Sequence, residues 1–197
     1  NHKIDKKATI MLFLLIEENF IWREIMVELE FQNYEENVKL FNKTKEKLSK
    51  VLTRAQTIEH VGSTAIENMY GKNIIDILVG VKNQEDFDLT FKQIEALGFR
   101  VGKNTESNFY HFFASSESET KSGDIHIHLV IIGTERYEEF LILRDFLKAH
   151  PEEAKKYSDH KLEMIKNGVT ERKEYRATKS LYVENLINRA KQELKNK

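Results

Sequence analysis

The stretch from Ile58 to Val81 constrains the fold of this chain most, because two short apolar segments flank one tight turn and one carboxylate. The first segment ends at Gly62 and Ser63, and the second carries Asp76 among isoleucine, leucine and valine residues. Short apolar runs bounded by turn residues predict buried strands. A carboxylate inside such a strand is costly unless a cation, a metal ion or several hydrogen-bond donors satisfy it. The stretch therefore predicts a polar site on an otherwise apolar sheet.

The turn between these segments has residue types that suit an anion. Gly62 permits a tight backbone turn, and we expect Ser63 and Thr64 to cap a helix that starts there. The free N–H groups at such a helix start would form an anion cradle. Twelve residues separate Ser63 from Asp76, and Lys72 lies between them, where it either contacts a phosphate or is a solvated loop residue.

This stretch resembles the signature of the GrpB family, a group in the nucleotidyltransferase-fold superfamily. The superfamily pattern is an apolar residue, then Gly, then Gly or Ser, a spacer, and Asp-x-Asp or Asp-x-Glu on the next strand. Residues 62–63 and Asp76 match this pattern, whereas Leu78 stands where the second carboxylate belongs. The chain also has Glu67 and Asn73 where the family has two prolines.

Three further segments carry the resemblance, which runs from about residue 34 to the last helix. Residues 143–152 resemble the family's Phe-Arg-Asp-Tyr-Leu-Arg-Ala-His-Pro-Glu, and residues 126–130 resemble its His-Leu-His-Val strand. Nearer the C-terminus, Tyr175, Lys179 and Ser180 match its Tyr-x-x-x-Lys-Ser pattern.

The resemblance implies a phosphoryl-transfer site in which Asp76 holds Mg²⁺ or Mn²⁺ and shares the catalytic role with His128. A phosphoryl centre needs fixed donors and a divalent cation to offset the charge that develops. The residues expected to bind the phosphates are Gly62, Ser63, Thr64, Lys72, Arg144, Tyr175 and Lys179. Arg144 could instead be a surface charge, and Lys179 could form a structural ion pair with Asp76.

One aspartate gives a divalent cation too few anionic ligands, so the metal site needs further residues. Alternation along the strand 124–132 places His126 and His128 on one face, roughly 6–7 Å apart, where both could reach one metal ion. Imidazole ligands would move the preferred metal from Mg²⁺ toward Mn²⁺ or Zn²⁺. Glu59 is the other candidate ligand. Alternatively, the histidines are hydrogen-bonded in a polar pocket, for example to Asp76.

The order of the segments predicts an α+β fold, with a nucleotidyltransferase-like small mixed β-sheet, packed helices and a C-terminal helical segment. Residues 34–197 would form this domain and residues 1–33 a helical extension. Apolar spacing over 8–30 indicates a helix packed on the domain, on a second copy in a homodimer, or on another partner. The other expected elements are helices over 34–52 and 84–97, strands over 99–101, 108–114 and 124–132, a loop over 115–123, and helices from residue 135 onward, with breaks at Pro151 and Gly168.

Composition excludes several classes of protein. The net charge is −1 over 197 residues, which gives no strong sign of nucleic-acid binding. Cysteine is absent, which excludes a disulfide framework or thiolate zinc site and is compatible with the cytoplasmic location that we expect. The apolar run over 10–16 is too short to cross a bilayer, so we expect no membrane segment.

Three functions are compatible with these features. The first is metal-dependent transfer of a nucleotidyl group from a nucleoside triphosphate to an acceptor. The second is binding of a nucleotide or another anionic metabolite without turnover, which Leu78 favours because it removes a carboxylate. The third is a phosphohydrolase whose metal ion is held by His126 and His128.

Overall fold

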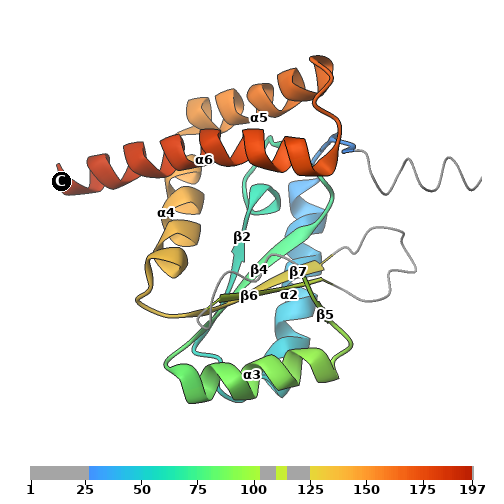
Figure 1. The fold of residues 1–197 in the computed structure, drawn as a ribbon, viewed down its shortest axis with the longest axis vertical. Coiled ribbons are helices and arrows are strands. Elements are labelled where there is room, and N and C mark those ends of the chain that lie inside the picture. Colours follow the sequence, from blue (N-terminus) through green and yellow to red (C-terminus); the bar gives the residue numbers. More distant parts are fainter. Residues whose placement is uncertain (1–26, 103–109, 115–124, 197) are drawn as a thin grey trace, which may run out of the picture.

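The computed structural model describes residues 27–102, 110–114 and 125–196 (Figure 1). Its helices are α2 (Tyr34–Val51), α3 (Gln84–Ala96), α4 (Glu135–Ala149), α5 (Pro151–Lys166) and α6 (Arg172–Lys195), with a 3-10 turn, η1 (Ser63–Ala65). Its strands are β1 (Glu30–Phe31), β2 (Thr57–Val61), β3 (Tyr70–Gly71), β4 (Ile75–Val81), β5 (Arg100–Val101), β6 (Tyr110–Ala114) and β7 (Ile125–Ile131). The predicted α+β class with a small mixed sheet and a helical C-terminal part is confirmed.

The main sheet has the strand order β2-β4-β7-β6-β5. Strands β4 and β7 run parallel, and the other neighbours run antiparallel. The register places Val61 of β2 and His126 of β7 on either side of Asp76 in β4. Residues that lie opposite one another in neighbouring strands point to the same face, so Asp76 and the two β7 histidines share one face.

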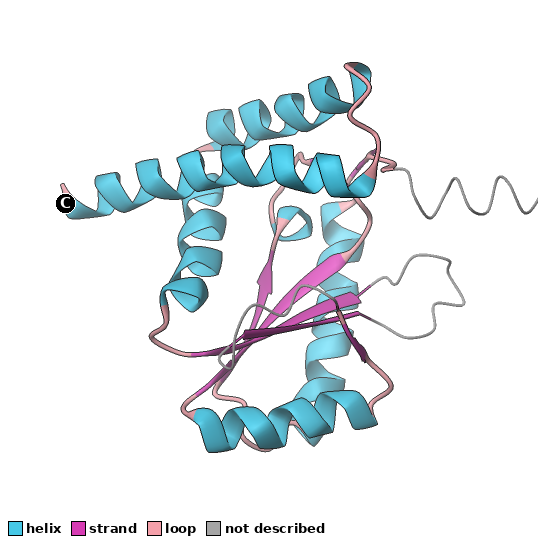
Figure 2. Ribbon diagram, in the orientation of Figure 1, coloured by secondary structure: helices cyan, strands magenta, loops and turns pink. Residues whose placement is uncertain are grey.

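Helices cover both faces of this sheet (Figure 2). The face without Asp76 is apolar and packs on α2 and α3, with Leu48, Ile77, Phe87, Ile94 and Ile127 in its core. On the Asp76 face, Tyr137, Phe140 and Leu141 of α4 pack over Val61, Leu78 and Val130. Alternation of side chains therefore gives the sheet one largely apolar face, which also carries His60, and one face that becomes polar near Asp76.

The C-terminal helices pack at the end of the sheet where β2 ends and β4 begins. Helix α5 contacts the short strand β3, and both α5 and α6 contact α4. Figure 1 shows α5 and α6 lying side by side above the sheet. Pro151 occupies the first turn of α5, where its missing N–H costs nothing. This packing brings side chains of α5 and α6 to the Gly62 turn.

Several predicted elements are confirmed, and two are wrong in part. The helices predicted over 34–52 and 84–97 end within one residue of α2 and α3, and β7 lies inside the strand predicted over 124–132. The predicted helix over 8–30 lies mostly outside the described residues, but Glu30 and Phe31 form a strand that pairs with β3. The loop predicted over 115–123 lies outside the described residues.

The brief helical segment predicted after Gly62 is present, but its predicted capping by the side chains of Ser63 and Thr64 is wrong. The chain forms only one 3-10 turn there, its N-cap is Gly62, and no side chain caps it. The Thr64 side chain is buried instead, with its hydroxyl donating to the Ile74 carbonyl and contacting His60. The predicted anion cradle at this helix start therefore has only the N–H groups of one 3-10 turn to draw on.

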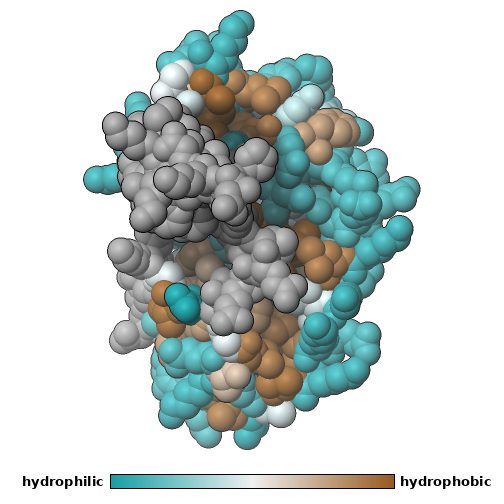
Figure 3. Space-filling view, turned by 90° about the vertical axis from the view of Figure 1, so that its right-hand side faces the viewer, coloured by the Kyte–Doolittle hydropathy of each residue, from teal (hydrophilic) through white to brown (hydrophobic). Residues whose placement is uncertain are grey.

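The surface carries few large apolar side chains among the described residues: Phe31, Leu89, Leu97, Val101, Leu181 and Leu194. On the face drawn in Figure 3, hydrophobic residues occur in small groups between hydrophilic ones. No helix in the described part of the chain has the length and apolar character needed to cross a membrane.

Candidate polyphosphate site

The Gly62 turn and Asp76 meet directly. Gly62 has φ 72° and ψ −172°, a backbone conformation found almost only in glycine. A Cβ atom at this position would overlap the Asp76 carboxylate, with Oδ2 as its nearest atom. The predicted convergence of the turn and the strand aspartate therefore has a steric basis in this structure, and only glycine permits it.

The other oxygen of Asp76 faces the two β7 histidines. His126 Nδ1 lies 3.4 Å and His128 Nε2 lies 3.2 Å from Oδ1. The far nitrogen of His128, Nδ1, is 3.0 Å from the Tyr110 hydroxyl. The Asp76 side chain is 26% exposed, so it is not sealed in the core. The histidines thus hold one oxygen of a carboxylate that solvent still reaches.

These contacts fix the charges at the site. Burial raises the pKa of Asp76, but the hydrogen bonds with His126 and His128 outweigh it and hold that pKa below its ordinary value. Burial lowers the pKa of His128, which favours a neutral ring. A neutral His128 can donate from Nε2 to Asp76 while Nδ1 accepts from the Tyr110 hydroxyl. Asp76 is therefore an anion at neutral pH.

Five cations gather near this carboxylate, and we call them the cation cluster: Lys72, Lys161, Lys179, Arg172 and Arg176. The Lys161 side chain donates to the Tyr70 carbonyl and lies over the Tyr157 ring, 4.7 Å from its centroid. Only 2% of Lys161 is exposed. Lys72 Nζ lies 5.3 Å from the centroid of Tyr175. Lys72 and Lys161 thus rest on aromatic rings, and Asp76 is the carboxylate that acts on Lys72 and Lys179.

The pKa values of the three lysines are all lowered, because burial and neighbouring cations disfavour their positive charges. Burial, together with the charge of Lys179, lowers the pKa of Lys161 to about 7. Burial, together with Lys179 and the two arginines, lowers the pKa of Lys72 to about 8. The pKa of Lys179 is also lowered by burial, although Asp76 opposes this shift. An anion of several charges bound here would therefore stabilise the charged forms of these lysines.

The serine of the turn lies beside this cluster. A Cβ atom added at Gly71 would lie 2.6 Å from Ser63 Oγ and 3.7 Å from Lys161 Nζ. The hydroxyl and the buried ammonium thus flank the same glycine of β3. A phosphate oxygen held near them would meet a neutral donor and a charged one.

Two predicted site residues pair with each other instead of with Asp76. Arg144 Nη1 is 2.8 Å from Glu59 Oε2, and Arg144 Nε is 2.7 Å from Asp145 Oδ1. His60 lies on the opposite face, stacked on Phe41 with ring centroids 4.7 Å apart. Glu59 and His60 are neighbours in β2 and point to opposite faces. Glu59 lies on the Asp76 face, where the ion pair with Arg144 neutralises its charge.

The predicted ligand set of Asp76, His126, His128 and Glu59 stays a prediction. Leu78, at the position of the superfamily's second carboxylate, is completely buried against the α4 cluster. Among the described residues, no group of three or more His, Asp or Glu side chains is arranged to hold a metal ion. Mg²⁺, however, is commonly bound through one or two carboxylates together with substrate phosphates. A single carboxylate such as Asp76 is therefore compatible with a divalent cation that is bound together with substrate phosphates.

Sequence reasoning missed Lys161, which is the most buried cation of the cluster. The signal was present in α5, where Ala154, Tyr157, Lys161 and Met164 follow helical spacing and are all buried. A lysine at a position of an apolar stripe requires an anion or a polar partner.

A family model and several related proteins match most of this chain. The family model described as GrpB protein matches residues 28–189. A UPF0157 protein of Vibrio cholerae is 32% identical over 162 residues, which are 82% of this chain and 80% of that protein. The UPF0157 protein YqkA of Bacillus subtilis is 32% identical over 147 residues, which are 74% of this chain and 41% of YqkA.

Other relatives and a solved structure agree. A UPF0157 protein of Pseudomonas aeruginosa is 29% identical over 68% of this chain and 54% of that protein; the chain thus spans about half the length of this relative and of YqkA. The crystal structure of conserved protein GrpB from Enterococcus faecalis superposes with a TM-score of 0.71 and 21% identity, over 85% of this chain and 99% of that one. The chain belongs to the GrpB family.

Proposed function

We propose that this chain binds the polyphosphate of a nucleotide between the Gly62 turn, Ser63 and the cation cluster. The observation that supports this most is the charge of the region: Lys179 and the two arginines act on Lys72, Lys179 also acts on Lys161, and Asp76 is the carboxylate that acts on Lys72 and Lys179. A bound polyphosphate would match these charges, and Ser63 would add a neutral donor. The motif resemblance to the nucleotidyltransferase-fold superfamily points the same way.

The number of cations favours a polyphosphate over a single phosphate. One phosphate carries about 1.5 to 2 negative charges at neutral pH, which would match fewer than half of the five cations of the cluster. Lysine acts on phosphate as a point charge, so several lysines can share a chain of phosphate groups without a strict geometry.

Calorimetric titration with the four common nucleoside triphosphates and with inorganic tripolyphosphate tests the proposal. Saturable binding of a nucleotide, displaced by tripolyphosphate, is expected; no binding at low salt would refute it.

Binding is expected to take up protons at pH 8 and to weaken as pH rises from 7 to 9. In the free protein the pKa of Lys161 is about 7 and that of Lys72 about 8, so both are partly neutral in this range. A bound polyanion favours the charged forms and raises both pKa values. Titrations at pH 8 in buffers with different ionisation enthalpies measure the proton uptake. Release of protons, or tighter binding at pH 9, would contradict the assignment of these lysines.

Nucleotidyl transfer is the second candidate, and one observation favours it: Asp76 is ionised and partly exposed beside the Gly62 turn. In such a transfer, an acceptor oxygen forms a bond to the α-phosphorus. The bond to pyrophosphate breaks, pyrophosphate leaves with the electron pair, and the acceptor proton passes to solvent. A divalent cation bound with the nucleotide would stabilise charge on the phosphate oxygens. This chain's own contribution would be to hold the phosphates with its lysines and to orient Asp76 through His126 and His128.

Asp76→Asn separates these two candidates. The substitution keeps the shape of the side chain but removes the negative charge nearest the phosphates. Metal-free nucleotide is therefore expected to bind as well as before or more tightly, because repulsion is removed. Metal-dependent turnover, if the protein transfers nucleotidyl groups, is expected to fall by about 100-fold or more. Calorimetry and product analysis measure the two effects; turnover that is unchanged would remove Asp76 from the catalytic role.

A further inference from the structure

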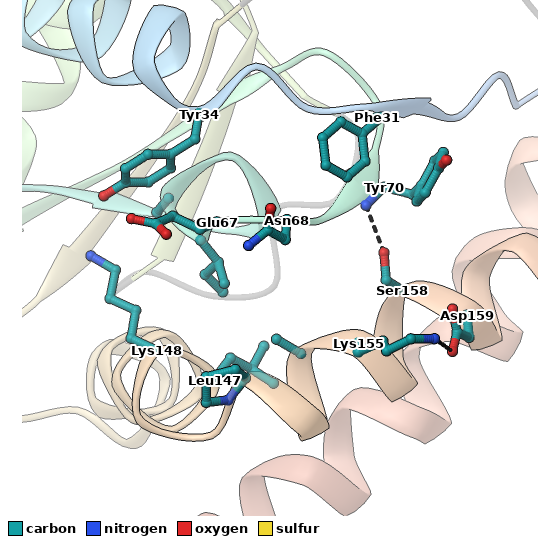
Figure 4. A pocket seen from close by; sticks show the side chains of 14 residues that line it. Phe31, Tyr34, Glu67, Asn68, Tyr70, Leu147, Lys148, Lys155, Ser158 and Asp159 are labelled. Carbon is teal, nitrogen blue, oxygen red and sulfur yellow. Dashed lines mark hydrogen bonds and ion pairs between the residues drawn. The ribbon is translucent and has the colours of Figure 1, made fainter.

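A cavity lies between the turn after η1, strand β3 and helices α4 and α5, and its lining differs in chemistry from the cation cluster. Its volume is about 700 Å³, within the range of small-molecule pockets. The turn after η1 and strand β3 form one wall, and α4 and α5 form the other (Figure 4). Phe31 and Tyr70 contribute aromatic rings that meet edge to face at 5.3 Å, while Ile66 and Leu147 supply apolar surface.

One end of this cavity holds two opposite charges. Glu67 comes from the turn after η1 and Lys148 from the last turn of α4, and in Figure 4 both side chains point toward the same space, beside the Tyr34 hydroxyl. Neither charged group has a hydrogen bond or ion pair with another described residue. The turn is held in an unusual backbone conformation, because Asn68 has φ 57°. A carboxylate and an ammonium are therefore both presented to a ligand.

The balance of charge in the lining excludes a polyphosphate here. Glu67 and Asp159 contribute two negative charges, and Lys148 and Lys155 contribute two positive ones. Lys155 is already paired with Asp159 at 2.5 Å. The lining thus has no net charge, in contrast to the cation cluster, and at one end it offers Glu67 and Lys148, which pair with no residue in the described part of the chain. A ligand of no net charge that carries both an ammonium and a carboxylate matches this arrangement.

We propose that this cavity binds a zwitterionic amino acid or short peptide with an aromatic or branched apolar side chain. Glu67 would bind its ammonium group and Lys148 its carboxylate, while the apolar side chain would pack between Phe31, Tyr70 and Leu147. None of the cation cluster lines this cavity, although Tyr70 of the lining accepts a hydrogen bond from Lys161.

The test is calorimetric titration of the full chain with L-phenylalanine and with the dipeptide Leu-Phe, in the absence of nucleotide. At least one zwitterion is expected to bind, and its N-acetylated amide, which lacks both charges, is expected to bind at least ten-fold more weakly. Glu67→Gln and Lys148→Gln should each weaken binding by about ten-fold, because each removes one charge-assisted hydrogen bond. Both residues are exposed, so neither substitution is expected to unfold the protein.

Lys155→Gln is the matched control, because Lys155 lines the same cavity but is paired with Asp159. It should change the affinity by less than about two-fold. Equal affinity in the wild type, Glu67→Gln and Lys148→Gln would overturn the assignment, and so would the absence of binding by either zwitterion at millimolar concentration. Because nucleotide is left out, failure here leaves the proposed polyphosphate site untouched, and failure of nucleotide titrations leaves this result untouched.

Discussion

Gly62→Ala is expected to destabilise the fold by about 3 kcal/mol, the larger of two effects on stability that this structure suggests. Backbone strain of a side chain in this region costs on the order of 1–3 kcal/mol. The added Cβ would also overlap the Asp76 carboxylate, and overpacking of this kind costs about 1–3 kcal/mol. Urea unfolding followed by circular dichroism measures the loss.

Gly133→Ala is the control that separates the cost of backbone strain from the cost of overlap between the added Cβ atom and Asp76. Gly133 also has a positive φ, 83°, but a Cβ atom added there would meet nothing within 4 Å. Only the left-handed backbone is then costly, by about 1–2 kcal/mol. If both alanine variants lost the same stability, the close approach of Asp76 to the turn would not be energetically significant, and the convergence of the site would lose its physical basis.

Lys161→Met is expected to be more stable than the wild type at pH 7 and to lose that advantage near pH 10. The folded protein holds the pKa of Lys161 at about 7, against 10.5 for the free side chain. Between these values the unfolded chain binds more protons, so wild-type stability rises with pH in this window, by up to ~4 kcal/mol, and is lowest below pH 7. Methionine removes this dependence but leaves the Tyr70 carbonyl without its donor, which costs about 1–3 kcal/mol at every pH.

The same variant is expected to bind tripolyphosphate at least about ten-fold more weakly at pH 7, since a charged hydrogen bond to phosphate is lost. Lys166→Met is a suitable control, because Lys166 is an exposed lysine on the same helix. Urea unfolding at pH 7 and pH 10 and calorimetry give both readings. A Lys161→Met protein that is less stable at pH 7 and binds normally would show that this lysine is a structural residue. A gain in stability with a loss of binding is the pattern typical of residues kept for function.

Local patterns were sufficient to predict the strands that carry the site. Alternation in 124–132 predicted that His126 and His128 share a face, and the apolar run around Asp76 predicted a buried strand next to the Gly62 turn. In the structure, the register of β4 against β7 then places the histidines within hydrogen-bond distance of the carboxylate. Such side-chain direction follows from the two-residue repeat of a strand, which is a local property.

Features that depend on distant contacts could not be predicted in this way. The pairing of Arg144 with Glu59 joins residues 85 positions apart, and it depends on how α4 crosses the sheet. The strand at residues 30–31 exists because β3 pairs with it, although its own sequence continues a helical pattern. The turn after Gly62 is short because the chain enters β3 almost at once, and this overrides the capping preference of Ser63.

A crystal structure of the protein with a non-hydrolysable nucleoside triphosphate and Mn²⁺ is the most direct test of polyphosphate binding by the cation cluster. We expect the phosphates to lie between Ser63, Lys161 and Lys179, with any metal ion bridging a phosphate oxygen and Asp76. A nucleotide bound elsewhere, with the cation cluster empty at a saturating concentration of ligand, would contradict it.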